Sequence, residues 1–456
     1  MPKSRRPVAP PKPVNIPASF LEGVLESVRG FLEPYLPIFH RTDMALTAWL
    51  YLQGLLSNLP RKSAEPIAEL HDVDRKVLQR FVGCSPWEDH KIRGKMIEDV
   101  SQAIGDPAGV LCLDPSAFPK KGMKSVGVKR QWCGRLGKKE NCQVGVFGSY
   151  ASPRGRCLVG TQLYLPKEWC ENKARRQECH VPEDRKYRKR WELALEVLAS
   201  ISVIPHACIL ADAEFGRCGE FRDLLTEAGE HYALDIPFSL NVRILKNGSV
   251  PSEAIQAGKW LKSLPKGAWI RVKTREGSQG DRIFESCWAD VTTERKDGTC
   301  RRETLLAIRP IETPSDVKLL LVRLPEGTSL AEMVQYGTRR WTIEDCFERA
   351  KTECGMAQYE VRSWVGWHHH MTMAILATWL MEKLRLSKQE SQTSKKKFPP
   401  SDVPTLRTHV GRAHFQPRSR SCSSGKEDLK ASEPESASCL LPQKEAETLL
   451  SSSGGR

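Results

Sequence analysis

The segment VLCLD at residues 110–114 is a short apolar run that ends in an aspartate, and ACILAD at 207–212 repeats this pattern. Between them, NCQVGVFGSYAS (141–152) and RCLVGTQLYLP (156–166) are rich in β-forming residues and flank the turn sequence PRG. These features predict two buried strands that end in Asp114 and Asp212, and an antiparallel pair between them.

Helical and extended segments alternate after this pair. Residues 188–201 form an amphipathic pattern, residues 220–228 are helical in character, and HYALDIP at 231–237 is typical of a strand. The order of three strands, a helix, a strand, a helix and a strand predicts a mixed α/β sheet.

The regions that flank this segment differ in their secondary-structure patterns. Residues 40–105 have a helical pattern, 239–324 is β-like with no expected helix, and helices return after residue 329. The fold class we predict is therefore α/β: a mixed-sheet core with a β-rich insertion, preceded by an all-helical N-terminal domain. The predicted organisation is a basic, proline-rich arm (1–17), a helical DNA-binding domain (18–105), the first part of the core (106–238), the insertion (239–328), the completion of the core (329–386) and a serine-rich disordered tail (387–456).

Composition limits the classes of function. The 456 residues contain 70 Lys+Arg against 55 Asp+Glu, a formal charge of +15. The longest nearly apolar stretch, 45–59, is shorter than the ~20 residues of a membrane span, and residues 1–17 lack the apolar core of a secretory signal. The 15 cysteines show no C-x-x-C spacing, which favours reduced thiols in the cytoplasm over disulfides or structural zinc.

The positive charge is concentrated rather than spread. Residues 120–139 hold eight basic side chains and no acidic one, and such a patch suits a polyanion, most often nucleic acid. The predicted phosphate contacts are Lys120, Lys121, Lys124, Lys129 and Arg130. A merely basic surface is the alternative.

Asp114 and Asp212 are the first candidates for chemistry. An Asp at the end of a buried strand needs a counter-ion, which a metal supplies, although such a residue also caps turns or helices. In RWTIEDCFERAK (340–351), Glu344, Glu348 and Lys351 share a helix face, with Thr342 as the expected N-cap. Three carboxylates that bind two Mg²⁺ ions suit phosphodiester chemistry; an exposed, ion-paired helix is the alternative.

Taken together, these motifs resemble the DDE transposases of bacterial insertion sequences. The resemblance runs from LDPSAFPKKGMKSVGVKRQWCGRLGKKENCQVGVF through LYLPKEW and LADAEFG to RWTIEDCFERAKTECGMAQYEVRSWVGWHHH, and covers about residues 40–385 in order. It implies an RNase H-like catalytic core, a β-rich insertion before the third acid, and cut-and-paste DNA transposition.

The resemblance also implies roles for single residues. Asp114, Asp212 and Glu344 would be the catalytic acids and metal ligands, for two Mg²⁺ ions that Mn²⁺ can replace. Arg340 and Lys351 match the Arg and Lys of the Y-R-E-K signature, whereas Tyr336 is one position too far from Arg340. The implied partner is double-stranded DNA, at element ends and target, bound by a dimer in a synaptic complex near the bacterial nucleoid. A decayed copy that only binds DNA is the alternative function, and a hydrolytic nuclease is a weaker one.

The consecutive histidines, three tryptophans and the basic side chains of the helical segment are further candidates for functional roles. One of His368, His369 and His370 could face the active site while the others lie at the surface. Aromatic residues usually belong to the core, but Trp364 or Trp367, and less favourably Trp132, could instead stack on unpaired bases. Basic side chains in the helical segment are expected to help bind DNA ends: Arg61, Lys62, Arg75, Lys76 and Arg80.

Overall fold

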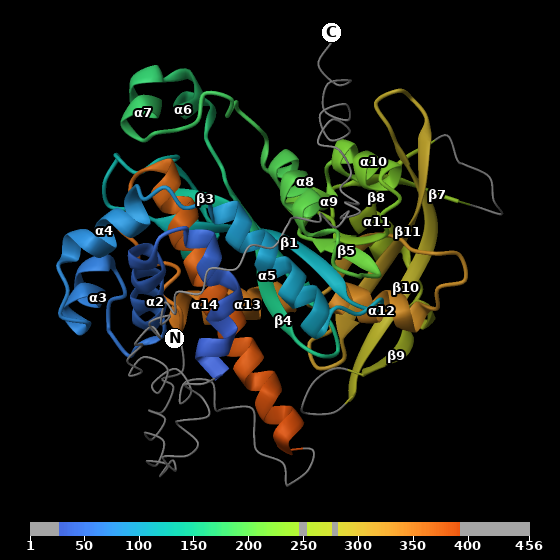
Figure 1. The fold of residues 1–456 in the computed structure, drawn as a ribbon. Coiled ribbons are helices and arrows are strands. Elements are labelled where there is room, and N and C mark those ends of the chain that lie inside the picture. The colour runs from blue at the N-terminus through green and yellow to red at the C-terminus, as the bar shows by residue number, and fades with distance from the viewer. Residues whose placement is uncertain (1–26, 246–252, 276–280, 393–456) are drawn as a thin grey trace, which may run out of the picture. The chain divides into compact units, whose positions relative to one another are not determined.

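The fold is a long mixed sheet with helices on both faces (Figure 1), seen in a computed structural model that describes residues 27–245, 253–275 and 281–392. The strands follow the order β2-β3-β1-β5-β6-β12-β11-β10-β7-β8, with β4 on β3 and β9 on β10. The strand bounds are β1 Val110–Pro119, β2 Lys129–Cys133, β3 Lys138–Ala151, β4 Arg156–Leu163, β5 Cys208–Ala211, β6 Tyr232–Asp235, β7 Asn241–Ile244, β8 Ile255–Gln256, β9 Ile270–Arg275, β10 Asp281–Glu294, β11 Cys300–Pro310 and β12 Lys318–Arg323.

Strand β1 pairs antiparallel with the strand on one side and parallel with the strand on the other. It runs antiparallel to β3, from Val110↔Ala151 to Pro119↔Cys142, and β3 continues antiparallel into β4 as predicted. On its other side β1 is parallel to β5, and β5 is parallel to β6. The mixed α/β sheet expected from the sequence is therefore present.

The prediction that β1 ends at Asp114 is wrong. The strand continues to Pro119, although its parallel pairing with β5 ends at Leu113↔Ala211. Pro115 follows this last pair, so its missing N–H removes no bond to β5. The long hairpin partner β3 keeps the rest of β1 extended, and Asp114 lies at the end of the parallel ladder rather than of the strand.

The region after β6 extends the same sheet. Strand β12 pairs antiparallel with β6, and β11 and β10 follow it. The expectation of a β region without helices is wrong, because α11 (Ala257–Ser263) interrupts it and buries Trp260 against β10, β11 and β12.

Helices cover the two faces of the sheet differently. On one face, α8 (Arg190–Ile201) packs closely against β3 and β4, since Gly148 and Gly160 leave room for Val197 and Ile201. On the other face lie α13 (Trp341–Thr352) and α14 (Trp364–Gln392). The remaining helices are η1 Glu33–Phe39, α2 Thr42–Leu56, α3 Ala64–Leu70, α4 Arg75–Gly83, α5 Asp89–Ile104, η2 Gly134–Leu136, α6 Lys167–Glu171, α7 Lys173–Glu178, α9 Ala213–Gly216, α10 Gly219–Glu227, η3 Lys266–Ala268 and α12 Leu330–Thr338.

The helices before β1 pack on α14. Helices α2, α4 and α5 all contact it, and Tyr51 of α2 bonds to His370 of α14 at 2.8 Å. This arrangement makes α14 a shared core element of the helical segment and the sheet (Figure 1). The proposed boundaries near residues 105, 238 and 328 remain predictions, and those at 17 and 387–456 concern the arm and tail, which lie outside or largely outside the described residues.

Two further sequence predictions concern membrane spans and the state of the cysteines. None of the helices within the described ranges is long and apolar enough to cross a membrane. The thirteen cysteines found there are all free thiols, and most are buried, for example Cys112, Cys142 and Cys208. They fill the core as expected.

Candidate active site

Four carboxylates from four elements surround the Arg340 guanidinium. Arg340 precedes α13; its Nε lies 2.9 Å from Asp235, one terminal nitrogen lies 2.9 Å from Glu344, and the other lies 3.9 Å from Asp114. Asp212 is close enough to contribute to the raised pKa of Arg340. The structure thus brings together the three acids that the sequence singled out, and adds a fourth.

Asp114 and Asp212 are neighbours because their strands are. The parallel ladder between β1 and β5 ends at Leu113↔Ala211, so each aspartate is the next residue of its strand. The Asp114 side chain is only 17% exposed. Burial, with repulsion from Asp212 and Glu344, raises the Asp114 pKa to about 8.

Asp212 has two functions in this structure. As N-cap of α9, its Oδ1 accepts bonds from the backbone N–H groups of Glu214 (3.0 Å) and Phe215 (3.3 Å). These bonds fix the orientation of the carboxylate, and burial raises its pKa. The capping role foreseen as an alternative is real, and it leaves Oδ2 outside the cap.

Asp235 was not singled out from the sequence. It ends β6, accepts from Arg340 through Oδ2 at 2.9 Å, and burial raises its pKa. Its Oδ1 is buried without a hydrogen-bond partner among the described residues. The signal was present, because HYALD repeats the apolar-run-then-Asp pattern of VLCLD and ACILAD.

Glu344 approaches from the helix side and is more accessible. Its side chain is 58% exposed and pairs with Arg340 one turn earlier. Glu348 is also exposed, one turn further along α13. Thr342 is not the N-cap expected from the sequence, because the helix begins at Trp341 after Arg340 and Thr342 is buried inside it.

Lys351 completes the cluster from the same helix. Its Nζ donates to Ser116 Oγ at 2.7 Å, two residues beyond Asp114 on β1. Burial and the nearby Arg135 lower the Lys351 pKa to about 8, against the opposing effect of Asp114. Arg340 and Lys351 therefore both lie beside the acids.

The donor atoms of this site are suited to a hard divalent cation. Four carboxylates against one arginine leave an excess of negative charge, and carboxylate oxygens are the ligands that Mg²⁺ and Mn²⁺ prefer. In the described ranges, however, no three His, Cys, Asp or Glu side chains are grouped closely enough to hold a metal ion. Arg340 supplies the positive charge at the centre of the acids.

The predicted phosphate contacts fall into two groups. Lys121, Lys124 and Arg130 are exposed. Lys120 instead folds back, with Nζ 3.0 Å from the Tyr359 carbonyl oxygen and over the Tyr359 ring, while Lys129 pairs with Glu168 at 2.5 Å. The exposed group is the more accessible to a polyanion, and within it Lys124 lies 4.0 Å from Glu178.

In the helical segment, the expectation for Lys62 is wrong. Its side chain is 2% exposed and its Nζ donates to the backbone carbonyls of Leu55 and Glu353. These bonds tie α2 to the end of α13. Lys76 and Arg80 remain exposed on α4.

The expectation that two of the three histidines lie at the surface is wrong, whereas the core position expected as the usual one for the tryptophans is found for Trp364 and Trp367. His368, His369 and His370 are all buried and bond to backbone carbonyls, so none lies at the surface. Trp364 and Trp367 are buried too, whereas Trp132 is 58% exposed. Trp132 is therefore the member of that set whose ring is accessible.

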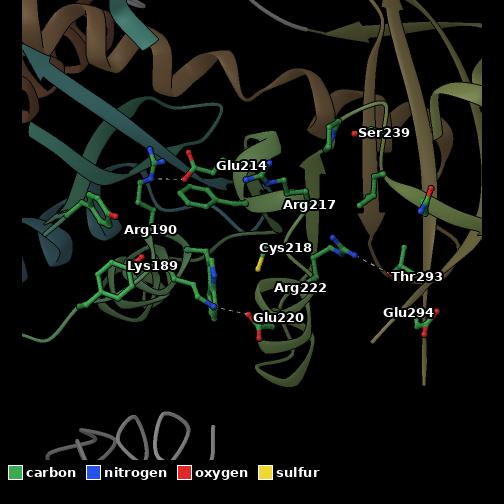
Figure 2. Close-up of a pocket in the computed structure, with 18 residues that line it drawn as sticks. Lys189, Arg190, Glu214, Arg217, Cys218, Glu220, Arg222, Ser239, Thr293 and Glu294 are labelled. Atoms are coloured by element: carbon green, nitrogen blue, oxygen red, sulfur yellow. Dashed lines mark hydrogen bonds and ion pairs between the residues drawn. The ribbon is translucent and has the colours of Figure 1, made fainter. Parts of the chain in front are cut away.

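A cleft of about 870 Å³ opens next to the second acid (Figure 2). Helices α8, α9 and α10 line one side, and residues around β7 and the end of β10 line the other. Within it, Arg190 pairs with Glu214 at 2.8 Å and Lys189 with Glu220 at 3.6 Å. Two of its basic lining residues are therefore paired with acids of α9 and α10, and a third, Arg222, pairs with Glu303 of β11 at 3.0 Å.

A probable transposase and a solved structure of another transposase are similar to this chain. The chain is 30% identical over 222 residues to the probable transposase for insertion sequence element IS701 of Microchaete diplosiphon, a match that covers 47% of this chain and 54% of that protein. The match thus spans about half of the relative's length. A cryo-EM structure of the piggyBac transposase synaptic complex with hairpin DNA has 11% identity and a TM-score of 0.40, over 85% of this chain and 77% of that one.

The family assignment rests on a family model that matches more than half of the chain. The model described as DDE superfamily endonuclease matches residues 34–294, which include Asp114, Asp212 and Asp235. The resemblance to DDE transposases of insertion sequences, first seen in the motifs, is confirmed by this match and by the IS701 relative. This chain belongs to the DDE superfamily of endonucleases, among the transposases of insertion sequences.

Proposed function

We propose that the chain is a transposase that cleaves DNA at the ends of an insertion sequence and joins the freed 3′-OH to a target DNA. The observation that carries the proposal is the convergence of Asp114, Asp212 and Glu344 on Arg340, from segments far apart in sequence. Of these acids, Asp114 and Asp212 are buried enough to require a counter-ion.

The sheet supports an RNase H-like core. Strand β1 has antiparallel neighbours on one side and the parallel strands β5 and β6 on the other, with α8 between β4 and β5. The strands β7–β12 then lie between β6 and the helix that carries Glu344. This order matches the core, insertion and third acid that the family resemblance implies.

Asp114, Asp212 and Glu344 would hold two divalent ions, Mg²⁺ or Mn²⁺. Such ions stabilise the charge that develops on the attacking and leaving oxygens of an in-line displacement at phosphorus. The chain itself orients Asp212 through its helix cap, and keeps Asp114 buried at the end of the parallel ladder. Lys351 and Arg340 add positive charge where a phosphate would lie.

The partner we propose is double-stranded DNA, first the element ends and then the target. Lys121, Lys124 and Arg130 would contact the backbone, because they are exposed and follow β1 on the chain. A synaptic complex that holds two ends would contain a dimer of this chain. A cytoplasmic site of action at the bacterial nucleoid fits this role.

A decayed DNA-binding copy is the alternative. It would keep the exposed basic side chains but not the acids, so the presence of all three candidate acids favours the enzyme. A hydrolytic nuclease would cut in the same way without joining strands, and a strand-transfer assay separates it from a transposase.

The test pairs binding and cleavage on one DNA. The probe is the genomic DNA that flanks the gene, which carries the element ends, and the variant is Asp212→Asn. We expect gel-shift affinity to persist and Mg²⁺-dependent cleavage to fall by orders of magnitude. Cleavage by Asp212→Asn at the parent's rate would show that the metal mechanism is wrong, and the DNA-binding reading would replace it.

A further inference from the structure

The hairpin formed by β2, η2 and β3 presents an exposed tryptophan among basic side chains. On β2, Arg130 and Trp132 are exposed while Cys133 is fully buried. The cross-strand pair Trp132↔Lys139 adds a lysine, and Arg130↔Asn141 lies beside it. This face of the hairpin is therefore aromatic and cationic.

The exposure of Trp132 is fixed by the register of the hairpin. Cys133, Cys142 and Val144 form a buried cluster on the opposite face, and Gln131 donates to the Cys142 carbonyl at 3.0 Å. A slip by one residue would bury Trp132 and expose Cys133. The fold thus holds a large aromatic ring in solvent, although burying it would be favourable.

The same register places Trp132 and Asp114 on one face of the sheet. Asp114 and Ser116 of β1 lie opposite Phe147 and Gly145 of β3. Because side chains alternate along a strand, these odd-numbered β3 residues share their face with Lys139, which lies opposite Trp132. Trp132 is therefore on the face of the sheet that carries the first acid.

The tip of the hairpin is adjacent to the acid cluster. Helix η2 contacts β1, and Arg135 of η2 and Asp114 both act on the Lys351 ammonium. Arg130, Arg135 and Lys139 have no ion-pair partner within 4.0 Å in the described part of the chain, although Arg130 lies near enough to Glu140 to help lower the pKa of that carboxyl, and Lys138 pairs with Glu140 at 3.3 Å. An anionic group can therefore bind between the hairpin and the acids.

We propose that this hairpin binds an unpaired nucleotide of the DNA next to the cleavage point, with the base stacked on Trp132 and the phosphate near Arg130, Arg135 and Lys139. The occupant is a nucleic acid because the ring lies among free cations. It is unpaired because the faces of a base inside a duplex are covered by its neighbours. The inference rests on the proposed function, since it assigns a strand to the same site.

Binding of short DNA tests the inference without cleavage. The probes are fluorescein-labelled dT12 and a 12-base-pair duplex, measured by anisotropy in EDTA with Asp114→Asn as the parent. Trp132→Ala should weaken dT12 binding roughly 10- to 100-fold, as for the loss of base stacking, and should leave duplex binding within about threefold, because duplex binding rests on phosphate contacts. Trp132→Phe should restore most of the dT12 affinity.

The matched control is Trp288→Ala, because Trp288 is similarly exposed (48%) but lies on β10, far along the sheet from β2. It should bind both probes like the parent. Unchanged dT12 binding by Trp132→Ala, or an equal loss on both probes, would overturn the inference. A change of oligomeric state in size-exclusion chromatography would also overturn it, and would assign the hairpin to contact with a second copy. None of these three results bears on the proposed function, because cleavage is measured separately, with Mg²⁺ and an intact Asp114.

Discussion

Two buried clusters of charge in this molecule differ in their balance. Around Arg340, one arginine faces Asp114, Asp212, Asp235 and Glu344. Behind α10, Glu303 faces two arginines: its carboxylate lies 3.0 Å from Arg222 and 3.7 Å from Arg301. Both clusters join the core to a neighbouring segment, but the first has four acids around one arginine, whereas in the second Glu303 and Asp223 are each paired with arginines, Asp223 also with Arg295 at 2.9 Å.

In the second cluster, here called balanced, each acid is ion-paired with an arginine, although the Nε atoms of Arg222 and Arg301 have no hydrogen-bond partner within the described residues. Glu303 also accepts hydrogen bonds from Tyr232 (2.7 Å) and Thr293 (2.5 Å), and Arg301 reaches Asp223 and the Gly219 carbonyl oxygen. Its role is to hold α10 against β11. The acid-rich cluster instead leaves Asp114 with a raised pKa and Asp235 Oδ1 without a partner among the described residues. The balanced cluster thus pairs its acids with arginines, whereas the acid-rich cluster gathers more carboxylates around Arg340 than one guanidinium can neutralise.

The largest expected effect separates the two exposed glutamates of α13. Glu344→Gln removes a proposed ligand, and cleavage should fall by orders of magnitude, since metal-borne charge stabilisation is worth several kcal/mol. Glu348→Gln is the matched control, one turn away and equally a loss of one charge, and its effect should be mild. The measurement is the initial rate of Mg²⁺-dependent cleavage. If the Glu348 variant were the slower one, the third acid would be misassigned.

For a variant of the balanced cluster, the expected change is in the free energy of unfolding rather than in the rate of cleavage. Glu303→Gln leaves Arg222 buried without its counter-charge and Arg301 with Asp223 alone, which costs about 3–5 kcal/mol of unfolding free energy. Asp114→Asn, which removes a carboxylate from the acid-rich cluster, should not destabilise the metal-free protein. Urea unfolding in EDTA measures both. Equal losses in the two variants would remove the distinction between the clusters.

The pH dependence of stability should also differ. The folded-state pKa of Asp114 is about 8, above the usual 3.8, so the unfolded chain releases this proton first as pH rises. Metal-free stability should therefore fall between about pH 4 and pH 8, by at most about 1.4 kcal/mol per pH unit for one group. Thermal unfolding in EDTA should show the advantage of Asp114→Asn over the parent growing across this window and levelling above it. A constant difference would mean that Asp114 ionises normally in the folded state.

The sequence predicted the acids better than it predicted their surroundings. An apolar run that ends in Asp is a local signal, so Asp114 and Asp212 could be identified, and Asp235 could have been found by the same rule. The continuation of β1 past Asp114 could not be seen, because Pro115 reads as a strand end and only pairing with β3 keeps the chain extended. Local patterns indicate where a strand begins, but a partner strand decides where it ends.

The partners of single side chains depend on tertiary contacts and were predicted least well. Three consecutive histidines suggested a partly exposed group. In the structure, α14 is enclosed by the helical segment and the sheet, and each histidine ring forms a hydrogen bond with a backbone carbonyl oxygen. Lys62 and Lys120 read as surface cations, but both end on backbone carbonyl oxygens. Nothing in the neighbouring sequence distinguishes them from Lys121.

The smallest expected effect concerns two surface cations, one unpaired and one ion-paired, and the salt dependence of DNA affinity. Lys121 is exposed with no ion-pair partner in the described ranges, whereas Arg309 is bound to Glu285 at 2.7 Å and stacked on Trp269. If an unbalanced charge marks a binding site, Lys121→Ala should lower the slope of log affinity against log salt by about 0.9, the value for one phosphate contact.

Arg309→Ala, which removes the same charge from a balanced pair, should leave that slope unchanged. Gel shifts of the same duplex between roughly 50 and 200 mM salt, the range over which phosphate contacts are lost, resolve the two. An equal change of slope in both variants would mean that total charge, rather than unpaired charge, determines DNA affinity, and Lys121 would then have no particular role in binding.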